Sequence, residues 1–225
     1  MPIIPLYSTT SHPDAWHQVR APGGYEWWYF DAEDVERDRQ VVAILFDGFV
    51  FHPGYLRRHF RFRRFPTKFA PAAPSEFVCA YFVVYHAGRI EHQFMTQYPV
   101  ARFRASMTSP DVEVGPNRFL GSGNALHLEL SGTPWELTWR GPRLLESAAL
   151  SGDFAFTPTT NASPAKLEFF SQSLSGAEHH WVIANPVCDV AGTIRITGSD
   201  PIAFRGRGYH DHNYGTGPIG PGLKR

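Results

Sequence analysis

The chain has 225 residues, of which 43% are apolar and 15% aromatic, and its formal net charge is zero. This composition excludes a disordered chain, and the balanced charge gives no global indication of nucleic-acid or anionic-membrane binding. The length suffices for one or two domains, and the aromatic content favours an all-β protein. The first ten residues hold neither a basic start nor a long apolar run. We therefore expect no signal peptide, no transmembrane segment and a cytoplasmic location.

The first clear strand signal is Tyr25–Asp31, which follows a Pro-, Ser- and Gly-rich arm at residues 1–24. Seven residues with five aromatics, bounded by glycines and an acidic turn, predict a strand that is buried on both faces. Glu26 shares its parity with Trp28 and Phe30, so we expect it to lie inside. A buried carboxylate needs a partner, and a structural ion pair or hydrogen bond is favoured over a catalytic role.

A strand, a basic segment and a hairpin follow. Val41–Phe46 is predicted as a strand, and Phe77–His86 with Arg89–Tyr98 as a hairpin. Between them, Arg57–Lys68 interleaves five arginines and one lysine with phenylalanines. We expect an edge strand there, with Arg on the wet face and Phe on the core face. The alternative, a site for single-stranded nucleic acid, lacks a basic surplus elsewhere in the chain.

Short strand-like segments separated by polar turns recur through the rest of the chain. They are Phe103–Met107, Asp111–Val114, Ala125–Leu130, Trp135–Arg140, Leu144–Phe156, Leu167–Leu174, His179–Ile183, Thr193–Ile196 and Phe204–Tyr214. Strands at this spacing, with almost no helical periodicity, are typical of an antiparallel barrel or sandwich. Cys79 and Cys188 lie in strand-like runs, and we expect them to be buried free thiols.

The segment Gly206–Gly215 concentrates protonatable side chains between glycines. In a strand, alternate side chains point to opposite faces of the sheet. Tyr209, Asp211 and Asn213 then share one face. His210, His212 and Tyr214 share the other face. Only one of these sets can line a pocket, so the two faces correspond to two different chemistries.

The first possibility is acid chemistry. His179 and Trp181 share a face, and they could meet Tyr209 and Asp211 inside a barrel. A carboxylic acid in apolar surroundings has a raised pKa and can donate its proton, and an indole face can stabilise a cation. His179 or Tyr209 could then orient or deprotonate a water. This set suits hydration of an alkene or an acid-triggered cyclisation.

The second possibility is a metal site on the opposite face. His210-x-His212 and His180 offer imidazoles there, and a further ligand could come from His86 or His92. The sequence offers no second closely spaced ligand pair, so we expect no metal. A third possibility is that these polar residues form a satisfied network that closes the end of the barrel.

Three of these segments carry a family resemblance. Gly24–Asp31 and Gly206–Gly215, with His179-x-Trp181 followed by Pro186, resemble the carotenoid 1,2-hydratase (hydroxyneurosporene synthase) and AttH-like family. The segments keep the family's order and approximate spacing, so the resemblance spans nearly the whole chain. It implies an all-β fold, with lipocalin-like antiparallel β-barrels in tandem. Residues 1–24 would form an N-terminal arm and residues 25–205 the first barrel. Residues 206–225 would form a crossing strand and a Gly/Pro-rich linker toward a second barrel.

The resemblance also implies functional roles. The active site would consist of His179, Trp181, Tyr209 and Asp211. Asp211 would donate a proton to a terminal isoprenoid double bond, without a metal or an organic cofactor. We expect Tyr25, Trp27 and Asn213 to bind the substrate.

The expected partners are an apolar isoprenoid or polyene substrate, a membrane that gives peripheral access to it, and the second barrel, with no nucleic acid. Alternatives on the same fold are a cyclase or pericyclase, and a non-catalytic binder of small hydrophobic molecules.

Overall fold

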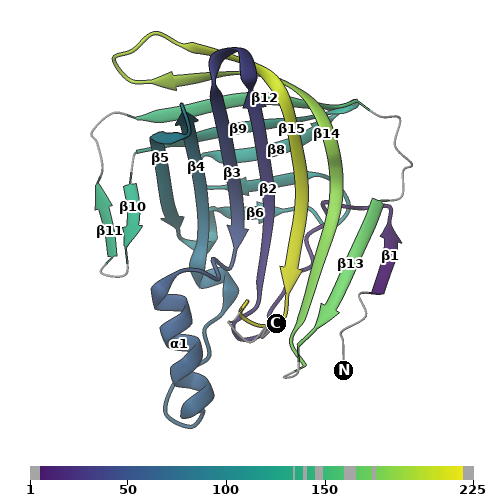
Figure 1. The fold of residues 1–225 in the computed structure, drawn as a ribbon. Coiled ribbons are helices and arrows are strands. Elements are labelled where there is room, and N and C mark those ends of the chain that lie inside the picture. The colour runs from purple at the N-terminus through teal and green to yellow at the C-terminus, as the bar shows by residue number, and fades with distance from the viewer. Residues whose placement is uncertain are drawn as a thin grey trace.

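A computed structural model describes residues 6–133, 135–138, 141–144, 149–159, 166–173 and 176–219. The described chain forms one strongly curved antiparallel sheet of 13 strands, a separate two-stranded ribbon and one α-helix, α1 (Figure 1). Residues 1–5 of the expected arm, residues 139–140 of an expected strand and residues 220–225 of the expected linker lie outside the described residues.

The elements have the following bounds. The strands are β1 (Leu6–Thr10), β2 (Tyr25–Asp34), β3 (Arg39–Asp47), β4 (Val78–His86), β5 (Arg89–Tyr98), β6 (Phe103–Ala105), β7 (Asp111–Val114), β8 (Asn117–Ser122), β9 (Ala125–Gly132), β10 (Trp135–Thr138), β11 (Gly141–Leu144), β12 (Leu150–Pro158), β13 (Lys166–Gln172), β14 (Glu178–Ile196) and β15 (Ile202–Gly215). The helices are α1 (Pro53–Arg64) and the 3-10 turns η1 (Val35–Arg37), η2 (Pro74–Phe77) and η3 (Val100–Arg102).

The sheet curls into a nearly closed barrel, which confirms the predicted lipocalin-like antiparallel fold. Its strand order is β5-β4-β3-β2-β15-β14-β12-β9-β8-β7-β6. The long strand β14 pairs with two strands along one edge: its first part pairs with β13, and its second part pairs with β12. On its other side it pairs with β15, and residues 207–215 of β15 pair with β2. Residues 207–215 of the expected crossing segment are therefore part of this sheet.

Aromatic side chains fill the interior of the barrel. Trp28 and Phe30 on β2 are fully buried and reach across to Phe119 on β8, with 5.3 Å between the ring centroids of Phe30 and Phe119. Phe156 on β12 packs edge-on against Phe30. Burying an aromatic side chain of this size contributes about 2–3 kcal/mol. The interior is a packed core, so the expectation of a pocket inside this barrel is wrong for the described residues.

The segment Arg57–Lys68 is not an edge strand: α1 covers most of it. His52 caps the helix, because its Nδ1 accepts from the backbone N–H of Gly54 at 2.9 Å, and Pro53 occupies the first turn. Tyr55 and His59, four residues apart, form the buried face of the helix. The alternation of Arg and Phe mimics a strand period, but this spacing of buried residues follows the helical one.

Other differences from the sequence predictions concern boundaries. His179–Ile183 and Thr193–Ile196 belong to the single strand β14, whereas Leu144–Phe156 contains the end of β11 and the start of β12. The unpredicted strand β8 is short and glycine-flanked. The arm contains β1, which pairs with β13. Both cysteines are buried and free, as expected. The described part of the chain contains no helix that combines the length and apolar character needed to cross a membrane.

Candidate active site

The period-two prediction for β15 is confirmed, but the face that was expected to point inward points outward. His210 and His212 are fully buried beside Phe30 and Trp28, on the interior side of the barrel. Asp211 therefore lies on the outer face of the sheet. The physical reason is that the aromatic core and the N-terminal arm bury the histidine face, where His210 meets Asp14 and His212 meets Glu26.

Two glycines of the motif are required by close approach. A Cβ atom at Gly208 would lie 2.6 Å from the carbonyl oxygen of Asp31. A Cβ atom at Gly215 would lie 2.6 Å from the hydroxyl of Tyr25. Both distances are shorter than real Cβ contacts, so glycine at these positions lets β15 lie tightly against β2.

The carboxylate of Asp211 is the centre of the candidate site. Its Oδ2 accepts from Trp181 Nε1 and from the Tyr209 hydroxyl, each at 2.8 Å. Its Oδ1 accepts from Asn213 Nδ2 at 2.6 Å. Asp211 is 8% exposed and Trp181 is 38% exposed, so the carboxylate is buried and its indole partner is partly open to solvent. The structure thus brings together three of the four predicted catalytic residues, with Asn213 beside them.

The fourth predicted residue, His179, lies on the same face but binds elsewhere. Its Nδ1 is 2.6 Å from the Tyr25 hydroxyl. Burial, followed by the neighbouring charge of His180, lowers the pKa of His179, although Asp211 opposes the shift. With Nδ1 engaged by Tyr25, a substrate or water would meet Nε2.

A second carboxylate, Asp31, joins the site. It lies at the end of the predicted strand Tyr25–Asp31 and was not among the expected site residues. The hydroxyl of Tyr29 donates to Asp31 Oδ2 at 3.0 Å, and Asp31 is directly opposite Tyr209 in the sheet. Burial raises the pKa of Asp31, the bond from Tyr29 opposes this, and the negative charge of Asp211 adds to the rise. Its parity with Tyr25 and Trp27 was a usable signal, because it places Asp31 on the same face.

An open groove of about 700 Å³ lies next to these carboxylates. Its lining includes Asp31, Tyr209, Pro186 and Val187. The pairing of β14 with β15 shifts register on either side of Asn185, and such bulges bend a strand and change the direction of its side chains. The bulged part of β14 thus forms one wall of the groove.

The expected substrate-binding residues lie toward the other end of the same face. Trp27 is half-buried, stacks on Tyr25 with 4.9 Å between ring centroids, and also contacts Phe51. Asn213 is directly opposite Trp27 in the sheet. Their roles in substrate binding stay predictions.

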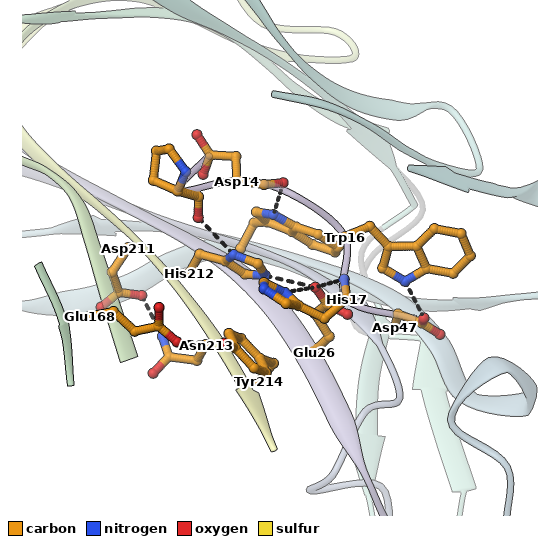
Figure 2. A network of polar contacts seen from close by, with 12 residues as sticks. Asp14, Trp16, His17, Glu26, Asp47, Glu168, Asp211, His212, Asn213 and Tyr214 are labelled. Atoms are coloured by element: carbon orange, nitrogen blue, oxygen red, sulfur yellow. Dashed lines mark hydrogen bonds and ion pairs between the residues drawn. The ribbon is translucent and has the colours of Figure 1, made fainter. Parts of the chain in front are cut away.

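The opposite face of β15 carries a polar network that the N-terminal arm covers (Figure 2). His210 contacts the carbonyl oxygen of Tyr29 at 2.8 Å and Asp14 Oδ1 at 2.7 Å. Burial alone would lower the pKa of His210, but Asp14 more than offsets this and the pKa is raised. His210 and Asp14 thus form a buried ion pair.

Glu26 is buried at the centre of the same network, as its parity predicts. Its Oε1 accepts from the backbone N–H of His17 at 2.8 Å and lies 3.0 Å from both His17 Nδ1 and His212 Nε2. Burial would raise the pKa of Glu26, but its bonds to His17 and His212 lower it. The expected structural partners of Glu26 are therefore two histidines.

The residues of the alternative metal arrangement have other partners. His210 is engaged with Asp14, and His180 contacts Glu168 at 2.8 Å instead. The potential ligand atoms of His17, Glu26 and His212 do lie within 4.8 Å of one another, a spacing that a metal ion could bridge. The hydrogen bonds to Glu26 Oε1 account for the same spacing without a metal.

The fold is a lipocalin-like antiparallel sheet, and its outer face carries the cluster of Trp181, Asp211 and Tyr209. The sequence is 32% identical, over 97% of this chain and 56% of the relative, to a hydroxyneurosporene dehydrogenase from Chlorobaculum tepidum. The fold is similar to a crystal structure of an AttH-type protein from Nitrosomonas europaea, with a TM-score of 0.52 at 15% identity, over 92% of this chain and 55% of that one.

Together these similarities confirm the resemblance to AttH-like proteins that the end motifs predict. No family model matches the chain. The chain spans a little over half the length of both proteins.

Proposed function

We propose that this chain provides the acid-bearing face of an enzyme that adds water to, or triggers cyclisation of, a C=C bond in an apolar isoprenoid or polyene. The observation that carries the proposal is the set of three side-chain donors on the Asp211 carboxylate. A similar protein is named for hydroxyneurosporene, which supports a substrate of the carotenoid type.

In the proposed reaction, protonated Asp211 gives its proton to one carbon of the double bond, which leaves a cation on the other carbon. The donors from Trp181, Tyr209 and Asn213 then stabilise the carboxylate that remains, so they lower the barrier to proton transfer. Water adds its oxygen to the cation. The proton that water loses returns to Asp211, directly or through His179, and the product is an alcohol.

The name of the relative states a dehydrogenase, so the reaction itself has to be tested. Neurosporene and hydroxyneurosporene would be offered in detergent micelles, and the products measured by mass spectrometry. Hydration gives a product heavier by one water, and dehydrogenation gives one lighter by two hydrogens. Only the heavier product, or an isomer of unchanged mass from cyclisation, agrees with the proposal.

Asp211→Asn tests the assignment of the acid. We expect it to abolish turnover while the thermal unfolding curve stays within a few degrees of the original. Asp153→Asn, the same change at an exposed position on β12, is the control and should be active. Full activity of Asp211→Asn with loss in Asp31→Asn would move the acid role to Asp31 and contradict the assignment to Asp211.

A non-catalytic binder is the second candidate, and the contact between Trp27 and the exposed Phe51 favours it, because these rings offer apolar contacts that need no acid. Both carboxylate oxygens already have side-chain donors, as in a structural network that needs no substrate. A binder would hold a polyene with an affinity that depends on Trp27 and not on Asp211. Tight binding without turnover, unchanged in Asp211→Asn, would establish this alternative.

A further inference from the structure

We propose that residues 51–69, which comprise α1 and its flanks, form a docking surface for a membrane with anionic lipid headgroups. We call these residues the basic–aromatic segment. Lipid binding by this segment stands on its own observations. Its use for delivering an apolar substrate to the Asp211 face rests on the function proposed above.

The first observation is uncompensated positive charge. The stretch from His52 to Ser75 contains no Asp or Glu, although the whole chain has equal numbers of acidic and basic residues. Arg58 alone in the segment pairs with a carboxylate, that of Glu76, at 3.0 Å. Among the described residues, no ion pair engages the other basic side chains, which are Arg57, Arg61, Arg63, Arg64 and Lys68. Each such cation near an anionic bilayer adds favourable energy.

The second observation is exposed aromatic surface within the same segment. The side chains of Phe51 and Phe60 are more than half exposed, and those of Phe65 and Phe69 are at least two-fifths exposed. Single exposed apolar residues are ordinary, but four phenylalanines among unpaired cations are not.

The cations lie over these rings. The Arg64 guanidinium is 5.4 Å and the Lys68 ammonium 5.9 Å from the Phe65 centroid, and Arg61 is 5.7 Å from that of Phe69. In interfacial amphipathic segments, apolar rings lie at the boundary of the acyl chains and cations lie at the level of the headgroups. The same pairing of rings and cations is present here.

The third observation is the way in which α1 packs against the barrel. Tyr55 and His59 hold α1 against the barrel, and the Tyr55 hydroxyl donates to the carbonyl oxygen of Gly24 at 2.5 Å. Figure 1 shows that α1 extends beyond the end of the barrel, next to the end of β3 and the start of β4. Arg57, Arg61 and Arg64 on this projecting helix are exposed.

A row of aromatic side chains leads from this segment to the candidate site. Phe51 lies 6.0 Å from Trp27, measured between ring centroids. Trp27 is directly opposite Asn213, which donates to Asp211. A polyene that leaves the acyl region of a bilayer would meet apolar contacts along this row.

Vesicle co-sedimentation of the 225-residue chain tests the proposal. The probes are phosphatidylcholine vesicles and vesicles of equal parts phosphatidylcholine and phosphatidylglycerol. We expect binding to the anionic vesicles, weak or no binding to the neutral ones, and release by high salt. Arg57→Gln/Arg61→Gln should bind about 30-fold more weakly, because two surface cations are lost. Gln keeps the helix propensity of Arg, so α1 should remain folded.

The matched control is Arg89→Gln/Arg195→Gln, which removes the same charge from exposed positions at the opposite end of the strands. It should bind like the unmodified chain. Phe60→Ser/Phe65→Ser should also weaken binding while the charge is unchanged.

Equal binding by the Arg57/Arg61 variant and the control would overturn the proposal. So would equal binding to neutral and anionic vesicles, or tight binding of a single-stranded oligonucleotide with none to vesicles. Asp211→Asn should bind vesicles normally, which keeps this test separate from the test of catalysis in micelles.

Discussion

The indole nitrogen of Trp181 lies 2.8 Å from Asp211 Oδ2, and the two residues come from the neighbouring strands β14 and β15. The ring therefore meets the acid with its N–H edge. One face of the indole is near Phe169, with 5.5 Å between ring centroids. Trp181 is thus a hydrogen-bond donor to the carboxylate. The role expected from the sequence was a different one, in which the face of the indole stabilises a cation.

Trp181→Phe keeps an aromatic ring but removes this donor. We expect kcat to fall by about 10²-fold, because a preorganised donor to the developing carboxylate is lost. The free energy of unfolding should change by less than about 1 kcal/mol, since Trp181 is partly exposed. The control is Trp16→Phe, which removes an equal indole–carboxylate bond of 2.8 Å to Asp47 and should leave kcat unchanged. Equal loss of kcat in both variants would contradict the role of Trp181.

Asp14→Asn removes the anion of the buried pair with His210. A buried imidazolium without its partner is strongly destabilising, so we expect a loss of about 3–5 kcal/mol in chemical denaturation. Asp189→Asn breaks the exposed pair with Arg207, which lies at 3.2 Å, and should cost about 0–1 kcal/mol. If both variants lost the same amount, the buried pair would not have the role assigned to it.

Asp47 should make stability depend on pH. Burial raises the pKa of its carboxyl to about 6, with the bond from Trp16 opposing and the charge of Glu26 adding to the rise. An unfolded Asp titrates near pH ~4, so between these values the folded state binds more protons, and stability falls as pH rises. Asp47→Asn should remove this effect. The free energy of unfolding of this variant, measured with urea, should equal that of the unmodified chain at pH ~4. Above pH ~7 it should be higher by about 3 kcal/mol. A gain that is independent of pH would contradict the raised pKa.

His179 and His210, on opposite faces of the sheet, should have pKa values that are shifted in opposite directions. The pKa of His179 is lowered, mainly by burial, and that of His210 is raised by Asp14 against the effect of burial. Followed by NMR of the ring protons, His179 should lose its charge at a lower pH than the histidine of a short unstructured peptide, and His210 at a higher pH. Because the pKa of His210 is raised, the stability that its charge contributes is complete below the pKa of an unfolded histidine. It is lost as pH rises through the folded value.

Much of the architecture could be predicted from short-range patterns, and α1 shows where these patterns fail. The all-β class, the strands β2 to β5 and the antiparallel hairpins follow from period-two alternation and turn residues. In the segment after His52, the alternating Arg and Phe fit a strand equally well. The helix forms because His52 caps it and because Tyr55 and His59 can be buried together against the barrel, which is a tertiary contact.

By itself, the sequence determined which residues share a face. In β15 alternate side chains point to the same face, so Asp211 lies with Tyr209 and His210 lies with His212. The structure keeps both pairs together. Which group points inward was decided only by the tertiary structure, because both faces of β2 carry aromatic side chains and either could have formed a core. Closure of the sheet buries Phe30 against Phe119, and the arm supplies Asp14 to His210, so the histidine face becomes the interior. The Asp211 carboxylate is thereby left on the outer face, where its hydrogen-bond partner Tyr209 lines an open groove.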